Sequence, residues 1–195
     1  MALWYVLTRF GLKWVWAVVT PLLLWPLSAS AQDSDIPATL GNHTFAYGLT
    51  NDPFWLPVEA GGGEEMFNIA DARILDASSG VPCGTAFITD APTVEIHLDT
   101  APNENESAFL RVYVDVPTES ITDPYLLILG PDGQYRCNDD ARLPRYSGIM
   151  PVIDFVDPLE GRYLIWVGNY QQDPSAIAQL FVTALRANLP STDGY

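Results

Sequence analysis

The chain has 195 residues, with 24 acidic side chains against 9 lysines and arginines, and a formal net charge of −15. Proteins bind polyanions through clusters of cations that displace counterions, so this composition excludes nucleic acid and anionic membrane surfaces as partners. The acidity suits an exported protein that is kept soluble by self-repulsion. Cation binding is the second interpretation of the same charge.

Residues 1–31 have the features of a secretory signal peptide. A positively charged start precedes an apolar run over residues 14–27, and small residues follow at Ala29 and Ala31,. We expect cleavage after Ala31, export across the inner membrane, and no membrane span in the mature chain, residues 32–195. An uncleaved anchor is the alternative, but this run is shorter than the about 20 apolar residues that cross a bilayer.

The mature chain has the size of one domain. Short alternating apolar runs are separated by Pro, Gly, Asn and Asp, which is the pattern of an all-β protein. In its first part we expect strands over residues 54–58, 65–69 and 86–88, the first two on either side of a run of three glycines. Residues 71–75 form either a further strand or one helical turn.

Residues 93–99 and 110–116 alternate between apolar and polar side chains. In the second run Arg111, Tyr113 and Asp115 lie opposite the apolar face. Because side chains alternate across a strand, each run is expected to bury one face and to leave the other in water.

Residues 125–129 are apolar on both faces, which suits a central strand, and a Gly-Pro-Asp-Gly turn follows them,. Further strands are expected over residues 134–137, 152–156, 162–167 and 178–185. The last run also has helical propensity, but it is short and follows a turn-rich loop. These patterns predict a single antiparallel β-sandwich, jelly-roll-like, of about eight or nine strands.

Cys83 and Cys137 are the only cysteines. An oxidising compartment and an even count predict a disulfide between them. Such a bridge would close a loop of about 55 residues and stabilise the domain by roughly 4 kcal/mol. Two free thiols, or half of a metal site, are the alternatives. The metal site is the weaker of these because no histidine lies nearby.

The segment over residues 126–185 combines four motifs: a strand, the Pro131-Asp132-Gly133 turn, the run Asn138-Asp139-Asp140, and a strand that begins Gly161-Arg162-Tyr163. This combination resembles the bacterial pre-peptidase C-terminal domain family, and the best resemblance covers residues 93–185. The resemblance implies a β-sandwich that assists secretion, stability or substrate attachment, and some members bind calcium. The usual setting beside a protease is not seen in this sequence.

Calcium is the best chemical hypothesis, because it takes six to eight oxygen ligands, often from a loop dense in Asp and Asn. Asp154 and Asp157 are expected to approach this loop from the next strand. The alternative is an ordinary turn, in which such side chains bond their own backbone. The predicted ligands are Asp132, Asn138, Asp139 and Asp140.

No catalytic activity is expected. The two histidines, His43 and His97, lie outside nucleophile and zinc-protease motifs, and both are expected to be exposed,. A sugar-stacking surface is a further binding hypothesis, set against the more common role of aromatic side chains in the core of a sandwich. Its residues would be Trp55, Tyr163, Trp166 and Tyr170.

The sequence therefore predicts an exported protein, periplasmic or secreted, that acts as a non-catalytic binding or stabilising module with calcium as its candidate ion. One alternative is a structural or envelope-interaction protein without a small-molecule ligand. Another is an accessory domain acting beside a separately encoded secreted protease. The expected partner is an unidentified protein or polysaccharide of the cell envelope.

Overall fold

The structure is a computed structural model, and its described residues form an all-β protein. It describes residues 34–62, 66–68, 74–77, 79–80, 82–99, 108–117, 122–172 and 176–191. These residues contain 13 strands and no helix. The predicted signal peptide lies outside them. None of the described segments is a helix with the length and apolar character needed to cross a membrane.

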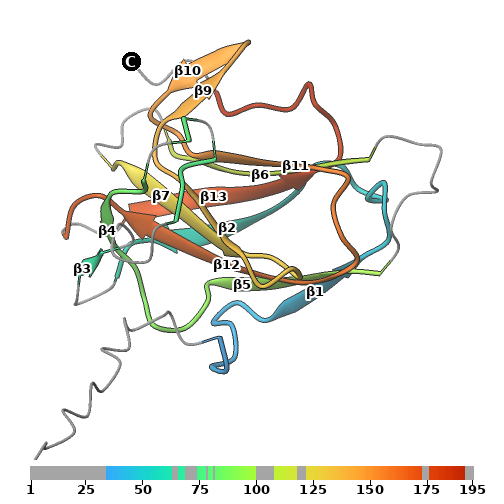
Figure 1. Cartoon of the computed structure of the whole chain (residues 1–195), viewed down its shortest axis with the longest axis horizontal. Helices are drawn as coiled ribbons and strands as arrows, with labels where there is room; N and C mark the ends of the chain where they lie inside the picture. Colours follow the sequence, from blue (N-terminus) through green and yellow to red (C-terminus); the bar gives the residue numbers. More distant parts are fainter. Residues whose placement is uncertain are drawn as a thin grey trace, which may run out of the picture.

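The larger sheet is built around β12 (Gly161–Asn169), which pairs antiparallel with β5 (Val94–Leu98) along one edge and β7 (Pro124–Leu129) along the other (Figure 1). As predicted, β7 is a central strand, because it also pairs with the next strand along the chain. The remaining strands of this sheet are β1 (Asn42–Phe45), β3 (Met66–Asn68), β4 (Thr85–Phe87) and β8 (Tyr135–Asn138).

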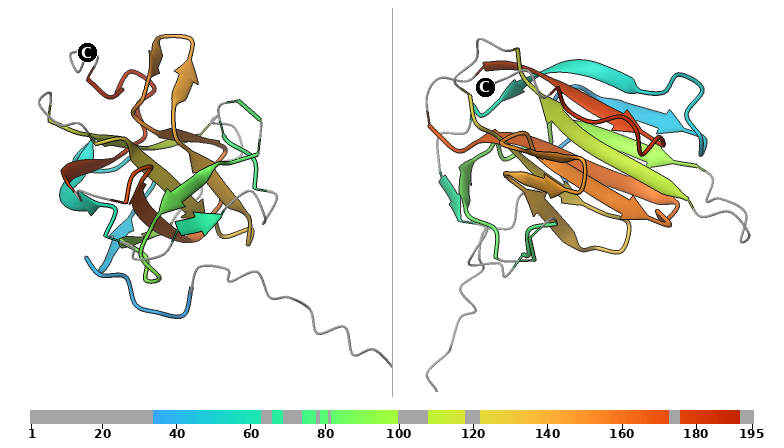
Figure 2. Two further views of the ribbon diagram at one scale, coloured as in Figure 1. Left: turned by 90° about the vertical axis from the view of Figure 1, so that its left-hand side faces the viewer. Right: turned by 90° about the horizontal axis from the view of Figure 1, so that it is seen from above.

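The smaller sheet has four antiparallel strands, in the order β11 (Val152–Val156), β6 (Phe109–Asp115), β13 (Ala176–Thr183) and β2 (Phe54–Ala60). Seen from above, the two sheets lie in layers, as the sequence predicted for a β-sandwich (Figure 2). The predicted antiparallel pairing has one exception, because β1 and β5 are parallel. Parallel strands need a long connection, and here the chain runs through β2, β3 and β4 between them.

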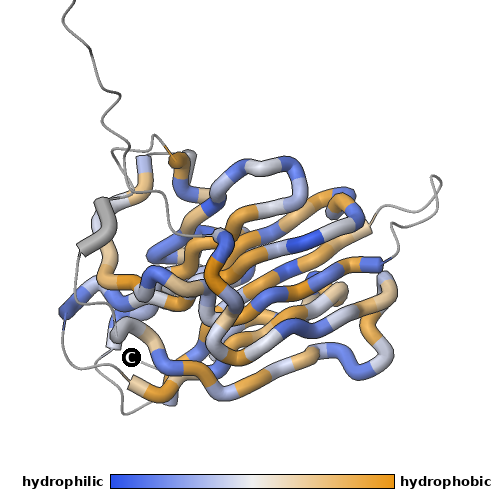
Figure 3. Tube along the Cα trace, turned by 90° about the horizontal axis from the view of Figure 1, so that it is seen from below, coloured by the Kyte–Doolittle hydropathy of each residue, from blue (hydrophilic) through white to orange (hydrophobic). Residues whose placement is uncertain are grey.

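The main core lies between the two sheets and contains the apolar faces predicted from alternation. Val94, Ile96 and Leu98 of β5 are buried there, facing β6 residues such as Val112. Figure 3 shows the alternation of apolar and polar residues along the strands. Burial of these faces supplies the hydrophobic stabilisation of the sandwich, at about 25 cal/mol per Å² of apolar surface.

The outer face of β6 is not in water, contrary to the prediction. Arg111 is 5% exposed and Tyr113 is 4% exposed. A hairpin of β9 (Ala141–Leu143) and β10 (Tyr146–Gly148) packs over this face together with the C-terminal segment. Alternation identifies the two faces of a strand, but an outer face is wet only if no later segment covers it.

Two residues of the predicted sugar surface are buried, on opposite faces of the larger sheet. Trp166 is fully buried in a cluster with Ile74, Cys83, Ala86 and Ile88, and Tyr163 lies in the main core. Trp55 and Tyr170 remain exposed, at 52% and 54%. The four aromatic side chains therefore do not form one platform.

The two histidines differ in their surroundings. His97 is exposed, as predicted, and lies 3.4 Å from Asp99. His43 belongs to β1 instead of a loop. Its ring lies 4.9 Å from the ring of Phe54, and its buried Nε2 atom has no hydrogen-bond partner among the described residues.

Candidate functional site

Three carboxylates meet at one end of the sandwich. One oxygen each from Asp123, Asp139 and Asp140 lies within 4.8 Å of the others. Beside them is an open cavity of about 210 Å³, whose lining includes Asp76, Tyr125 and the disulfide residue Cys83. The described residues of this cluster and of the cavity lining contain no histidine. These oxygens therefore form a candidate site for a hard cation.

The hairpin of β7 and β8 brings these residues together. Asp123 immediately precedes β7, and Asp139 and Asp140 immediately follow β8. The two strands are antiparallel, with Leu126 opposite Asn138, so the start of β7 and the end of β8 lie at the same end of the hairpin. The turn between the strands thus lies at the other end of the hairpin.

The cluster is electrostatically unfavourable without a cation. Burial, followed by the charges of Asp123, Asp140 and Asp76, raises the pKa of Asp139 from its ordinary value to about 7. Burial and the neighbouring Asp140 also raise the pKa of Asp123. Like charges held together in a poorly hydrated place disfavour ionisation, and a bound cation would reverse that effect.

Two of these carboxylates also have one oxygen without a hydrogen bond. The Oδ1 atoms of Asp123 and Asp139 are buried and have no partner among the described residues. Nearly all buried polar atoms in folded proteins are paired, and leaving one unpaired costs about 1–3 kcal/mol. The two oxygens are therefore available to a ligand.

Tyr125 adds a third unpaired group to the site. Its side chain lines the cavity and is 1% exposed, and its hydroxyl has no hydrogen-bond partner among the described residues. Burial, followed by the charges of Asp139 and Asp76, raises the pKa of Tyr125 far above its ordinary value, so the hydroxyl keeps its proton. A buried hydroxyl that faces a cavity without a partner points to a missing ligand or water.

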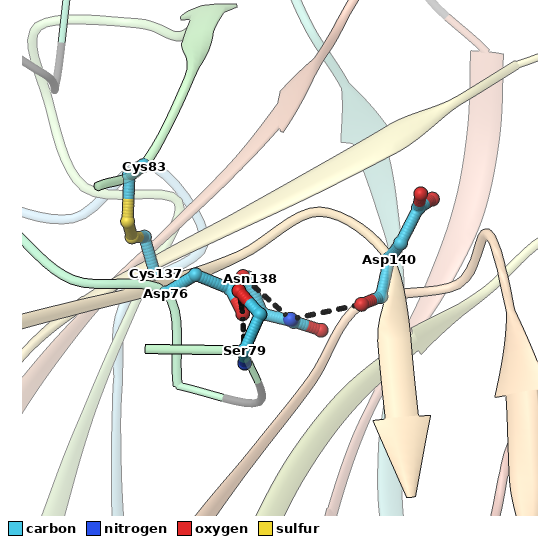
Figure 4. The surroundings of a disulfide bond; sticks show 6 residues. All are labelled: Asp76, Ser79, Cys83, Cys137, Asn138 and Asp140. Atoms are coloured by element: carbon cyan, nitrogen blue, oxygen red, sulfur yellow. Dashed lines mark hydrogen bonds between the residues drawn. A yellow bond between two sulfur atoms is a disulfide. The ribbon is translucent and has the colours of Figure 1, made fainter. Parts of the chain in front are cut away.

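Asn138 supports the site from beneath, although the sequence predicted it as a ligand. Its side chain is fully buried. Its Nδ2 donates to Asp76 Oδ2 at 2.8 Å and to the carbonyl of Asp140 at 3.3 Å, and its Oδ1 accepts from the amide of Val152 at 2.6 Å. Figure 4 shows Asn138 between Asp76 and the backbone of Asp140. Asn138 thus holds three segments of the site in place.

The predicted disulfide forms and closes one wall of the cavity. Cys83 and Cys137 are bonded, with Cα atoms 6.4 Å apart (Figure 4). The amide of Ala77 donates to the carbonyl of Cys137 at 2.8 Å, and Ser79 donates to Asp76. The wall that carries Asp76 is therefore tied to β8 directly before the acidic run.

Asp132 lies apart from the cluster, although it was predicted as a ligand. It sits in the turn at the opposite end of the hairpin, roughly 20 Å away for a strand of six residues,. There it pairs with Arg136 at 2.7 Å, and this hydrogen bond lowers the pKa of Asp132. Asp154 and Asp157 line a second cavity with it, of about 130 Å³.

The structure thus brings only some of the four predicted ligands together. Asp139 and Asp140 lie together, Asn138 supports them, and Asp132 belongs to the other end of the hairpin. Asp123 and Tyr125 were missed, because neither lies in a motif. The register of the hairpin was the available signal: pairing across the turn brings the residue before β7 beside the residues after β8.

In comparisons with known proteins, no family model, no curated protein and no solved structure matches this chain. The resemblance to the pre-peptidase C-terminal family stays a prediction from the sequence.

Proposed function

We propose that this chain is an exported, non-catalytic β-sandwich module that binds calcium at Asp123, Asp139 and Asp140. The observation that carries the proposal is the cluster of three carboxylate oxygens within 4.8 Å, two of whose residues have a buried oxygen without a partner. The buried and unpaired hydroxyl of Tyr125 supports it independently.

The donor set favours calcium over other common metals. Zinc prefers nitrogen and sulfur ligands, and the cluster offers only oxygen. Magnesium demands near-ideal octahedral geometry and keeps several of its waters, whereas calcium accepts flexible sets of six to eight oxygens at 2.3–2.6 Å. The cluster oxygens lie within 4.8 Å of one another, a span that one calcium ion can bridge.

Calcium would act first as a stabilising ligand. It would neutralise carboxylates that otherwise repel one another, and it would join the start of β7 to the segment after β8. The disulfide beside the site and the resemblance to secreted accessory domains support export to an oxidising, calcium-containing compartment,.

The test is the melting temperature of the purified protein in EDTA and then in millimolar calcium. A ligand that binds only the folded state stabilises it by about 2.7 kcal/mol at a hundredfold excess over Kd. For a chain of this size we expect a rise of about 5–10 °C. Magnesium at the same concentration is expected to give a smaller rise.

Two variants locate the ion. The double variant Asp123→Asn, Asp139→Asn removes two charges from the cluster and is expected to abolish the calcium-induced rise. Asp132→Asn removes a charge at the other end of the hairpin and is expected to leave the rise intact. No rise in the wild-type protein, or a rise that survives the double variant, contradicts the proposal.

A further inference from the structure

The proposed ion would be incompletely coordinated by the protein. Calcium takes six to eight oxygens, and the cluster supplies the carboxylates of three residues. The nearby Asp76 already accepts hydrogen bonds at both of its oxygens, from Ser79 and Asn138. Part of the coordination shell therefore faces the open cavity.

The cavity has room for more than the water that would complete this shell. Its volume of about 210 Å³ is more than ten times the roughly 15 Å³ that one water molecule needs. Arg142 also lines it. This guanidinium belongs to none of the ion pairs among the described residues, and it can donate hydrogen bonds to an incoming group,.

The net charge of the site favours a neutral ligand over an anionic one. The carboxylates of Asp76, Asp123, Asp139 and Asp140 outweigh one calcium ion and the guanidinium of Arg142 by one negative charge. The whole chain is strongly acidic as well, at −15. An anionic ligand would be repelled even by the loaded site, so a neutral ligand fits best.

Hydrogen-bonding chemistry narrows the ligand further. A neutral partner for calcium must offer two oxygens close together, and the buried Oδ1 atoms of Asp123 and Asp139 can accept hydrogen bonds from donors on that partner. Vicinal hydroxyls meet both needs, because each oxygen can bind the ion while its proton goes to a carboxylate. A peptide carbonyl accepts hydrogen bonds but donates none.

Tyr170 places an aromatic residue beside the site. Its side chain is 54% exposed, and its amide donates to the carbonyl of Asp123.

We propose that the bound calcium ion and Arg142 together capture a neutral polysaccharide through vicinal hydroxyls of one sugar ring. This inference rests on the proposed function, because the ion makes the contact. It extends that function from a stabilising ion to a recognition site. It also identifies Arg142, which is not expected to bind the ion, as the residue that separates sugar binding from calcium binding.

The test is retention of the purified protein on immobilised mannan, a neutral polymer rich in vicinal hydroxyls. We expect retention in millimolar calcium and release by EDTA or by free methyl α-mannoside. Mannan treated with periodate and then borohydride, which destroys vicinal diols, is expected to lose at least tenfold in binding. Carboxymethyl dextran, which carries negative charge, is expected to bind no better than this treated mannan.

Arg142→Gln is expected to weaken mannan binding at least tenfold while keeping the calcium-induced rise in melting temperature. Arg145→Gln is the matched control, since Arg145 is an exposed arginine between β9 and β10 that does not line the cavity. Normal calcium stabilisation without mannan binding, or equal loss in both arginine variants, overturns this inference alone. Absence of calcium stabilisation overturns the proposed function together with it.

Discussion

Two groups of buried charge in this molecule differ in whether their polar atoms are paired. On the outer face of β6, Arg111 binds both oxygens of Asp154, at 2.7 and 2.8 Å, and donates to the carbonyls of Arg186 and Asn188. At the end of the β7–β8 hairpin, Asp123 and Asp139 each have a buried carboxylate oxygen without a hydrogen-bond partner among the described residues.

The acidic cluster lacks the compensation that the covered face of β6 receives. The covered face of β6 shows that this fold can bury a charge and satisfy it, using an opposite charge and two carbonyls of the segment after β13. At the acidic cluster, by contrast, Asp123 and Asp139 are held beside like charges, and one buried oxygen of each has no hydrogen-bond partner among the described residues. An uncompensated group of this kind is costly, and the proposed calcium ion would compensate it from outside the chain.

The largest expected effect is at the compensated pair. Arg111→Ala leaves the carboxylate of Asp154 partly buried without its partner, and we expect a loss of about 3–5 kcal/mol in the free energy of unfolding. Urea denaturation monitored by fluorescence measures it. Arg136→Ala removes an arginine from a more exposed pair and serves as the control. Equal, small losses in both variants would mean that burial does not distinguish the two pairs.

Loss of the disulfide is expected to have a similar but slightly smaller effect. The double variant Cys83→Ser, Cys137→Ser frees a loop with a sequence separation of 54, and we expect it to lose about 2–4 kcal/mol. Calcium affinity, measured by calorimetry on the folded variant, should fall as well, because the wall carrying Asp76 is no longer tied to β8. Unchanged affinity would show that the hydrogen bonds of Asn138 are sufficient to hold the site.

The pH dependence of the ion-free protein tests the uncompensated cluster directly. Folded Asp139 keeps its proton until about pH 7, whereas the unfolded chain loses it near pH 4. Between these values the folded state holds more protons, so stability in EDTA falls as pH rises.

Asp139→Asn removes this titration and is expected to be more stable than the wild type at pH 8 in EDTA, by about 1 kcal/mol. Melting temperatures from pH 4 to pH 8 measure the difference. Asp132, whose pKa is lowered by Arg136, has the opposite sign, because its contribution is lost as the pH falls. An Asp139→Asn profile parallel to that of the wild type would contradict the assignment.

The smallest effect is expected at an exposed pair. Glu95 lies 2.9 Å from Arg162 on neighbouring strands, but their side chains are 22% and 44% exposed. Surface pairs of this kind contribute about 0.2–1 kcal/mol. Glu95→Gln should therefore change urea stability by less than 1 kcal/mol, and a larger loss would mean that the outer face of this sheet is less hydrated than its exposure indicates.

Local pattern was sufficient for much of the fold. Alternation placed the strands at β5, β6 and β11, and the apolar run identified β7 as central, because side-chain period and turn residues are local properties. The prediction missed β1, β9 and β10, which are only three or four residues long. Segments this short show little period, so their prediction is uneven: β3, β4 and β8 are as short and were expected.

The sequence alone predicted most of the strands, the cysteine pair and two of the three carboxylates of the acidic cluster, Asp139 and Asp140. Which residues complete the site depends on the tertiary structure. Asp123 and Tyr125 enter it through the antiparallel register of β7 and β8, and Asp132 is excluded because the turn lies at the far end of the same hairpin. Burial of Arg111 likewise depends on the hairpin and C-terminal segment that cover β6. Spacing along a chain records neighbours on one strand, whereas a site is formed by neighbours across strands.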